Sequence, residues 1–432
     1  PIPIKFGMKT ETLPKPEDAK EEDAAPTKEV DNIINNPSPA WTKQPSELKD
    51  EDYSGFYREL YPMQFEEPLF NIHLNVDYPF NLTGILYFPK MNKDMQIQKD
   101  KIQLYQNQVF VTDNVEGIVP EFLTMLRGVI DSPDIPLNVS RSYLQADGAV
   151  KKISSYITRK VGDKLKSLFN DNREEFNAKW DDIKIVIEYG MLTEDKFFDK
   201  AQDFMLYPTV DGNYHTFAEL KEKLAAAQTD KDDKLVLLYA SNKEEQHYYI
   251  AAAKDKGYEV LLLDSPIISH LIQKMETSQE KISFARVDGD HIDNLIKKDE
   301  EAISKLSDQE KETLKTFLTE TIPAEKFSVQ LEAMDSKSNP FIITEPEFMR
   351  RMKEMQQNGG GGGMFGMGNM PDMYNLIVNT NHELVTEILN TKTAKKKERL
   401  VNQALDLAKL SKGLLKGEDM TAFINRSYEM IK

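Results

Sequence analysis

GVIDSPDIPLNVSRSYLQ, residues 128–145, joins an apolar segment to a predicted helix, and its residue choices are hard to explain by folding alone. Its two prolines favour an extended backbone ahead of Asn138 and Ser140, either of which can cap that helix. Arg141 then falls in the first helical turn, where a cation faces the positive end of the helix dipole. An anionic partner would offset this unfavourable position.

Two kinds of partner for Arg141 fit the sequence. The loop itself supplies Asp131 and Asp134, and a salt bridge to one of these carboxylates is the ordinary explanation for a loop arginine. The other explanation is an arginine directed at a phosphate that is bound elsewhere. The residues alone leave both explanations open.

The sequence before this stretch predicts a helix followed by a sheet. A helix is expected from Ser46 to Leu60, because aromatic residues recur there on one side. Pro120 and the apolar residues after it predict a second helix, which ends near Gly128. Between the two helices, alternating or aliphatic segments predict strands at residues 69–76, 82–88 and 102–111.

The sequence after this stretch predicts a long helix and a second unit that starts around Trp180. The helix is expected to pack on the sheet through residues spaced by three or four: Val150, Ile153, Ile157, Val161, Leu165 and Leu168. In the second unit, residues 235–240 and 260–263 predict parallel strands joined by a helix that Gly257 terminates. No glycine-rich turn follows the first of these strands, so a dinucleotide site is not expected.

The C-terminal part contains a methionine-rich passage. Thr344 and Glu347 have the spacing of a capping box, which opens a predicted helix. That helix carries Phe348, Met349, Met352 and Met355. Five glycines at 359–363 and further methionines follow. This later passage is either a flexible tether or an adaptable apolar surface, since methionine repacks against varied partners.

Two closing helices each carry an apolar stripe that they cannot bury alone. The first presents Leu400, Ala404, Leu407 and Ala408, and the second presents Met420, Phe423, Ile424, Tyr428 and Ile431. A four-helix bundle across a two-fold axis buries both stripes. The sequence therefore predicts a homodimer that forms through this end of the chain.

Composition narrows the class of protein. The 432 residues exceed the size of one hydrophobic core, so two to four compact units are expected. The net charge of −17 disfavours nucleic acid and anionic membranes as partners. Zero cysteines exclude disulfides, Cys-ligated metals and thiol nucleophiles. Neither a membrane-spanning run nor a signal segment is evident, so a cytoplasmic location is expected.

Two further segments bear on order and on chemistry. Residues 15–31, KPEDAKEEDAAPTKEVD, contain a single large apolar residue and predict a flexible, extended linker. Asp288, Asp290 and Asp293 resemble a cation loop, but the glycine is misplaced and the bidentate glutamate is missing, so no metal site is expected. The sequence also lacks the G-x-x-x-x-G-K, H-E-x-x-H and G-x-S-x-G motifs, which argues against a self-contained enzyme.

Several segments closely resemble blocks of the heat-shock protein 90 family of chaperones, in family order, and specifically its bacterial branch. They are AWTKQPSELKDEDYSGFYREL from Ala40, IQLYQNQVFVTD from Ile102, the stretch 128–145, KGYEVLLLDSPI from Lys256 and FINRSYEMI from Phe423. The resemblance implies an α+β and α/β multidomain fold. Its expected parts are the last strand of an N-terminal ATPase domain (1–7), a charged flexible linker (8–37), a middle domain (38–298) and a C-terminal α/β dimerisation domain with a helix bundle (299–432).

The resemblance also divides the middle domain and implies its chemistry. Residues 38–179 are expected to resemble domain 2 of ribosomal protein S5, and residues 180–298 to form a second α/β unit. In this family, ATP and Mg²⁺ bind in an N-terminal domain, which the resemblance places outside these 432 residues. The middle domain supplies an arginine to the γ-phosphate with a nearby glutamine assisting, and the matching positions are Arg141 and Gln145. The phosphate explanation for Arg141 is thereby favoured, no cofactor is expected on this chain alone, and ATPase activity is expected only together with that domain.

Binding of unfolded or partly folded client proteins is implied as well. The expected client contacts are Trp41, Phe110, Phe348, Met349, Met352 and Met355, although Trp41 can instead pack on its own domain. Gln106, Asn107 and Gln108 depart from the family, whose strand carries two basic residues there. His270 stands where relatives carry a client-contacting tryptophan. The alternative function is an ATP-independent dimeric scaffold or holdase.

Overall fold

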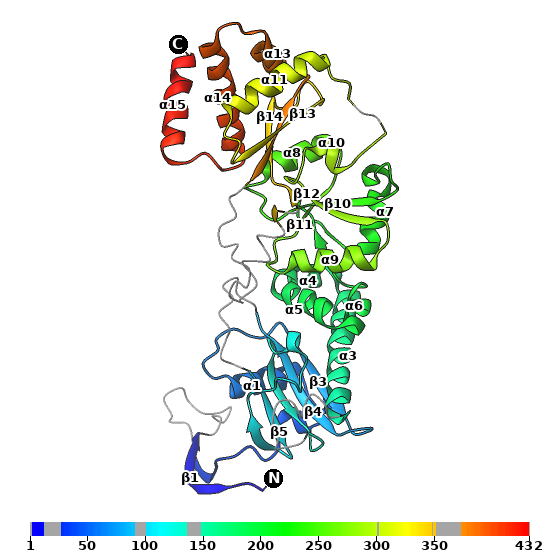
Figure 1. Cartoon of the computed structure of the whole chain (residues 1–432). Coiled ribbons are helices and arrows are strands. Elements are labelled where there is room, and N and C mark those ends of the chain that lie inside the picture. The colour runs from blue at the N-terminus through cyan, green and yellow to red at the C-terminus, as the bar shows by residue number, and fades with distance from the viewer. Residues whose placement is uncertain are drawn as a thin grey trace, which may run out of the picture. The chain divides into compact units, whose positions relative to one another are not determined.

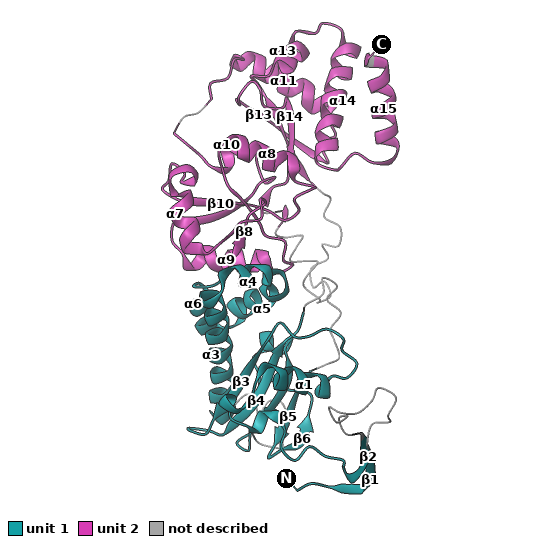
Figure 2. Ribbon diagram, turned by 180° about the vertical axis from the view of Figure 1, so that it is seen from behind, with its two compact units in different colours: residues 1–204 teal, residues 205–432 magenta. Residues whose placement is uncertain are grey.

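The computed structural model describes residues 2–12, 27–90, 101–135, 148–299, 302–347, 349–350 and 373–431. The chain (Figure 1) folds as two compact units, residues 1–204 and residues 205–432, which are coloured separately in Figure 2. Both contain helices and sheets, so the protein is a mixed α and β protein, as the sequence predicts. The domain boundaries expected at residues 179 and 298 do not coincide with this division and stay predictions.

The first unit begins with a two-stranded antiparallel sheet of β1 (Lys5–Thr12) and β2 (Thr27–Ile33). Asn35 extends the pairing, because its side chain accepts from the amide of Ile4 at 2.7 Å and donates to the carbonyl of Ile2 at 3.0 Å. The composition of residues 15–31 predicts a flexible linker, and for residues 27–31 this is wrong. Backbone hydrogen bonds to β1 order this segment with little apolar burial.

A five-stranded sheet forms the centre of the first unit. In spatial order its strands are β3 (Phe70–Val76), β4 (Leu82–Phe88), β7 (Arg127–Asp131), β5 (Ile102–Gln106) and β6 (Val109–Thr112). Only β5 and β7 pair in parallel. The short 3-10 helices η1 (Ala40–Thr42) and η2 (Pro45–Glu47) precede α1 (Asp50–Leu60), so the helix predicted from residue 46 begins at residue 50. Aromatic residues of η1 and α1 pack on one face of the sheet, against Ile85, Tyr87 and Val129.

Two predictions about this sheet are wrong. Residues 102–111, predicted as one strand, form the hairpin of β5 and β6, and its turn places Asn107 at φ 52° and Gln108 at φ 65°. The helix predicted from Pro120 to Gly128 is replaced by the 3-10 helix η3 (Glu121–Leu123) and by β7. Gly128 explains why this segment pairs with β4 as a strand. Its φ is +129°, and a Cβ there would lie 2.0 Å from the carbonyl oxygen of Ile85, so only glycine allows β4 to approach so closely.

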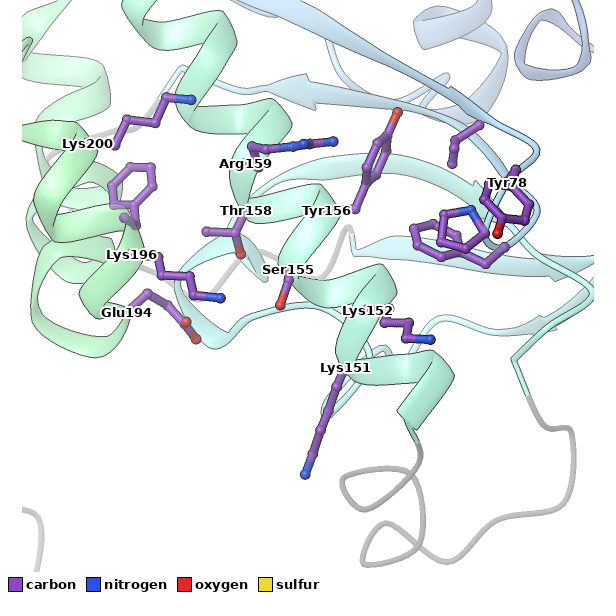
Figure 3. A pocket seen from close by; sticks show the side chains of 14 residues that line it. Tyr78, Lys151, Lys152, Ser155, Tyr156, Thr158, Arg159, Glu194, Lys196 and Lys200 are labelled. Carbon is purple, nitrogen blue, oxygen red and sulfur yellow. The ribbon is translucent and has the colours of Figure 1, made fainter.

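The helices that follow complete the first unit. They are α3 (Gly148–Asp171), α4 (Arg173–Ala178), α5 (Trp180–Thr193) and α6 (Asp195–Ala201). The long helix predicted after residue 145 is confirmed in α3, which contacts β3 and buries its predicted stripe except for the half-buried Leu168. Figure 1 shows α3 and α1 on different sides of the sheet. The turn between β3 and β4, together with α3 and α6, lines the hollow drawn in Figure 3.

The second unit contains a parallel sheet in the order β11 (Val260–Leu262), β10 (Leu235–Ala240), β12 (Ile282–Arg286). Helix α8 (His247–Asp255) connects β10 to β11, and Gly257 follows it with φ +76°, so the predicted strand–helix–strand unit is confirmed. The other elements of this part are β8 (Tyr207–Pro208), β9 (Tyr214–His215), α7 (Phe217–Gln228), α9 (Ile268–Ser278) and α10 (Ile292–Leu295).

Where the structure describes it, the rest of the second unit is a three-stranded mixed sheet with four helices. The strand order is β13 (Phe327–Glu332), β15 (Tyr374–Asn379), β14 (Phe341–Thr344). The helices are α11 (Asp308–Thr321), α13 (Glu383–Asn390), α14 (Ala394–Ser411) and α15 (Gly417–Ile431). One apolar core joins α11, α13 and α14 to this sheet. None of the helices described is both long enough and apolar enough to cross a membrane.

Candidate functional site at the end of strand β7

Asp131, the last residue of β7, is a buried carboxylate that holds two neighbouring segments. It accepts a hydrogen bond from the indole Nε1 of Trp41 at 3.2 Å and another from the backbone amide of Gln108 at 2.9 Å. Trp41 is only 6% exposed, with its ring centroid 5.4 Å from that of Phe56 and 5.0 Å from that of Tyr105. The structure therefore places Trp41 in its own domain, the alternative left open by the sequence, and a client role for it stays a prediction.

The residues after β7 are held from two sides. Ser132 donates its hydroxyl to the carbonyl of Asn81 at 2.6 Å, and Asp134 accepts from the amide of Asn81 at 2.7 Å. From β5, the side-chain amide of Gln106 donates to the carbonyl of Pro133 at 3.1 Å and to that of Ile135 at 3.2 Å. Residues 132–135, which we call the loop stem, are thus fixed to the start of β4 and the end of β5.

The predicted catalytic residues come next in the chain. Arg141 and Gln145 lie outside the described residues, as do the proposed caps Asn138 and Ser140. Asp131 and Asp134, the carboxylates considered as salt-bridge partners, bind Trp41, Gln108 and Asn81. The loop stem was not found from the sequence. No residue pattern marks it, because its contacts come from Asn81 and from the side-chain amide of Gln106.

An apolar surface lies on the hairpin beside this site. Phe110 is 54% exposed, Val109 is also exposed, and the Phe110 ring lies edge-on to Tyr105 with centroids 5.7 Å apart. A cleft of about 440 Å³ beside it is lined by residues that include Trp41, Tyr105 and Gln108. Burial, with the charge of Asp131 as a smaller cause, raises the pKa of Tyr105, which therefore stays neutral at physiological pH. Phe110 is thus available to a partner, as its predicted client role requires.

The predicted methionine-bearing helix is described only at its start. Met349 is half-buried, whereas Phe348, Met352 and Met355 lie outside the described residues. The capping box predicted at Thr344 is wrong. Thr344 is the last residue of β14, where it pairs with Asn375, and its buried hydroxyl has no hydrogen-bond partner among the residues that the structure describes.

The predicted dimerisation residues fall on two different faces of the closing helices. Ala404 is buried in the core of its own unit and Leu400 packs against that core, so the sequence stripe combined a core face with an outer face. On the outer face, Leu407 is 50% exposed, Tyr428 is 66% exposed and Ile424 is also exposed, while Phe423 is half-buried.

Polar contacts attach the last helix to α14. Arg426 donates to Gln403 at 2.7 Å and pairs with Asp406, and Gln403 also donates to Ser427 at 3.1 Å. No residue of α15 whose burial the structure describes is fully buried. Polar contacts therefore carry much of the attachment of α15 to α14, and apolar side chains of α15 remain exposed.

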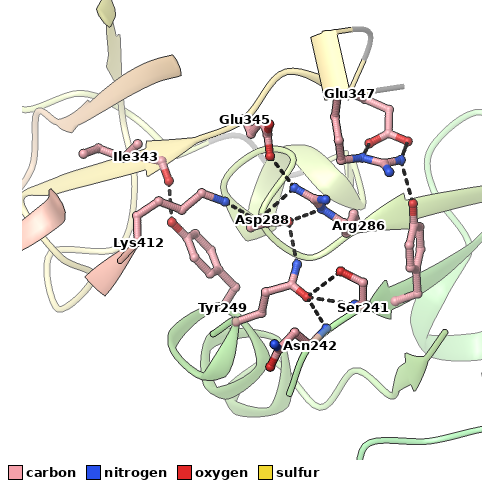
Figure 4. Close-up of polar contacts among 12 residues, drawn as sticks. Ser241, Asn242, Tyr249, Arg286, Asp288, Ile343, Glu345, Glu347 and Lys412 are labelled. Carbon is pink, nitrogen blue, oxygen red and sulfur yellow. Dashed lines mark hydrogen bonds and ion pairs between the residues drawn. The ribbon is translucent and has the colours of Figure 1, made fainter. Parts of the chain in front are cut away.

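A buried ion network lies elsewhere in the second unit (Figure 4). The Asp288 carboxylate accepts from Arg286 Nε at 2.5 Å and from Gln246 Nε2 at 2.8 Å, and it pairs with Lys412. Arg286 also pairs with Glu345 at 2.6 Å. Burial acts to raise the pKa of Asp288, but Arg286 and Lys412 outweigh it and hold that pKa below its ordinary value. The aspartate considered for a cation loop thus binds protein cations, an arrangement that sequence reasoning missed.

A family model described as Hsp90 protein matches residues 7–432. The chaperone protein htpG of Bacteroides fragilis strain 638R is 45% identical over an alignment that covers 100% of this chain and 72% of that protein. The chaperone protein HtpG of Porphyromonas gingivalis strain ATCC 33277 is 51% identical over 90% of this chain and 56% of that protein.

A more distant relative shows the same match. The chaperone protein HtpG of Myxococcus xanthus strain DK1622 is 28% identical over 79% of this chain and 52% of that protein. The chain therefore spans between about half and three quarters of the length of these relatives. Since the family model covers all but the first six residues, this chain belongs to the Hsp90 family.

Proposed function

We propose that this chain supplies the client-binding and dimerisation parts of an ATP-driven chaperone that assists folding and remodelling of other proteins. The observation that carries the proposal is the match of the family model to residues 7–432, together with relatives named chaperone protein HtpG. The cytoplasm is the proposed location of the protein. ATP and Mg²⁺ bind, on this proposal, in an N-terminal domain outside these 432 residues.

Arg141 is proposed to contact the γ-phosphate of that ATP, with Gln145 assisting. An arginine forms charge-assisted hydrogen bonds to phosphate oxygens and stabilises the charge that develops during phosphoryl transfer. The loop stem supports this role. Gln106 and Asn81 fix the chain up to Ile135, six residues before Arg141, so the segment that carries the arginine starts from a defined point.

Dimerisation is proposed through the outer faces of α14 and α15. Leu407, Leu410, Ile424 and Tyr428 are exposed there, and α15 contributes no fully buried residue among those described. A second copy related by a two-fold axis would cover these side chains in a four-helix bundle. Client proteins are proposed to bind exposed apolar side chains such as Phe110 and the predicted methionine-bearing helix.

The ATP-dependent role is tested with the 432 residues joined to the N-terminal domain of the Bacteroides relative. The substitution Arg141→Ala is expected to abolish most of the ATPase activity while ATP still binds, because it removes charge stabilisation of the transferring phosphate. Arg58→Ala is the matched control, since Arg58 pairs with Glu67 on the surface. Equal turnover in the Arg141→Ala and Arg58→Ala proteins would contradict the role of Arg141.

The second candidate function is a passive dimeric holdase, which the exposed Val109 and Phe110 favour. This protein would suppress aggregation of an unfolded client without ATP and without dependence on Arg141. Aggregation assays of the fused protein with and without ATP separate the two functions, because only the ATP-driven chaperone releases its client when nucleotide is added.

A further inference from the structure

A hollow of about 640 Å³ in the first unit has a strongly basic wall (Figure 3). It is lined by α3, by α6 with the residue before it, and by the turn between β3 and β4. Its charged residues are five cations and one carboxylate: Lys151, Lys152, Arg159, Lys196, Lys200 and Glu194. In a chain of net charge −17, this concentration of positive charge points to an anionic ligand.

Most of these cations have no acidic partner in the described part of the chain. Lys151, Lys152 and Lys196 are exposed and form no ion pair with a described residue, whereas Lys200 pairs with Asp163. In Figure 3, Lys196 reaches toward Ser155 on α3, Lys152 extends on the side of the hollow where Tyr78 lies, and Lys151 points away from both. Lys152 and Lys196 are therefore the cations best placed to meet one ligand from two helices.

The arginine of the hollow is positioned by an aromatic ring. The Arg159 guanidinium carbon lies 5.4 Å from the centroid of the Tyr156 ring, and Phe80 packs edge-on against that ring at 5.7 Å. The Tyr156 hydroxyl donates to the carbonyl of Asn75 at 3.5 Å, which helps to fix the ring. A guanidinium held by a cation–π contact keeps its N–H donors available for an anion.

The distribution of these groups indicates the class of ligand. Cations on two helices, with the hydroxyl of Ser155 between them, match several linked anionic groups better than a single small ion. Tyr78, which is 85% exposed at the rim, offers a flat ring on which an aromatic base can stack. We propose that this hollow binds a soluble ligand that carries two or more linked phosphate groups. The proposal uses neither Arg141 nor the ATP of the proposed function and stands independently of both.

Calorimetric titration of the 432-residue chain with sodium tripolyphosphate tests the proposal. The double substitution Lys152→Glu/Lys196→Glu is expected to weaken binding by about tenfold or more, because it replaces two attractive contacts by repulsive ones. The matched control is Lys164→Glu, which makes the same kind of charge reversal on α3 outside the hollow and is expected to change binding less than about twofold. The neutral variant Lys152→Gln/Lys196→Gln is expected to bind tripolyphosphate more tightly than the double-Glu variant and less tightly than the Lys164→Glu control. Circular dichroism checks that every variant is folded.

The source of the phosphates is distinguished by comparing ATP with tripolyphosphate. If the ligand is a nucleotide, Tyr78→Ala is expected to weaken ATP binding several-fold and to leave tripolyphosphate binding unchanged. If the ligand is an inorganic polyphosphate, Tyr78→Ala is expected to change neither ATP binding nor tripolyphosphate binding. Three results would overturn the proposal. The first is that the double-Glu variant binds tripolyphosphate as tightly as the wild-type chain does. The second is that sulfate binds as tightly as tripolyphosphate. The third is that poly-glutamate displaces tripolyphosphate at a lower concentration of charge, which would indicate a surface for acidic proteins.

Discussion

The ammonium group of Lys412, at the C-terminal end of α14, pairs with the buried carboxylate of Asp288, 124 residues earlier in the chain. Asp288 lies just after the last strand of the parallel sheet, so the pair joins that sheet to the helix that carries Leu407. Arg286 and Gln246 complete the contacts of the carboxylate. Removing one partner of such a buried charge therefore destabilises the folded protein.

Removal of this carboxylate is predicted to destabilise the second unit strongly. Asp288→Ala leaves Arg286 buried without its nearest counter-charge, which costs about 3–5 kcal/mol of unfolding free energy. Lys412→Met is expected to cost less, because Arg286 and Gln246 still satisfy Asp288. Urea unfolding measures both, with Lys416→Met on the exposed segment after α14 as the control. An Asp288→Ala protein as stable as the Lys416→Met protein would show that the network contributes little.

The same carboxylate predicts how stability depends on pH. The pKa of Asp288 is lower in the folded protein than the ordinary value near 3.9, so its contribution is fully present above about pH 5. This contribution is lost as the pH falls below the pKa of Asp288 in the unfolded state and then through its lower pKa in the folded state. The difference in unfolding free energy between the wild-type and Asp288→Asn proteins should therefore be constant from about pH 7 to pH 5 and shrink below about pH 4. A difference that grows on acidification would contradict this assignment.

Gln106 is predicted to position the loop stem for ATP hydrolysis. Gln106→Ala removes the hydrogen bonds to Pro133 and Ile135, so in the fused protein kcat is expected to fall several-fold while KM for ATP changes little. Gln103→Ala is the control on the same strand, because the Gln103 side chain bonds to Tyr105 and not to the stem. Steady-state ATPase assays decide the point, and an equal effect of both substitutions would rule out a specific role for Gln106.

Trp41 and Phe110 are predicted to differ in what they contribute. Trp41→Ala removes a buried ring and its bond to Asp131 and is expected to cost about 3–5 kcal/mol of stability. Phe110→Ser changes an exposed side chain and is expected to alter stability by less than about 0.5 kcal/mol while weakening suppression of client aggregation. Unfolding curves and aggregation assays on the same preparations separate these effects. A stable Trp41→Ala protein with impaired client binding would instead assign the client contact to Trp41.

Oligomeric state tests the exposed face of the closing helices. Leu407→Glu combined with Ile424→Glu places charges on the proposed interface and is expected to yield a monomer at micromolar concentration. Ile303→Glu is the control, since Ile303 is an exposed isoleucine of the same unit outside these helices. Light scattering reports the mass. A wild-type chain that is already monomeric would remove the dimer from the proposed function.

Regular periodicity made the helices and the parallel strands predictable. The apolar spacing of α3 has one solution, in which Val150, Ile153 and Ile157 face the sheet, and Gly257 marks the end of α8 as its positive φ requires. The run from Phe122 to Ile130 misled because β7 is buried at every position, so its apolar residues do not alternate along the strand and resemble those of a helix. The turn at Asn107 and Gln108 was hidden because neither residue is glycine, the usual residue at positive φ.

The candidate site was less predictable than the fold. Arg141 stays a prediction from its expected helix position and the family resemblance, whereas the groups that anchor the loop stem come from Asn81 and Gln106, which have no sequence signature. The pairing of Asp288 with Lys412 depends on tertiary structure alone. On α14, one helical stripe contains both core and outer residues. The packing of α11 and α13 against this helix decides which of these residues are buried and which are exposed.

Asp131 connects features that sequence reasoning treated as separate. Its single carboxylate holds the indole of Trp41 and the turn of the hairpin that displays Phe110, and the loop stem begins at the next residue. A client that displaced either aromatic residue would therefore strain the hydrogen bonds of Asp131, which lies next to the loop stem. In the proposed chaperone, the occupancy of the apolar surface and the rate of nucleotide turnover would then depend on each other through this one acidic side chain.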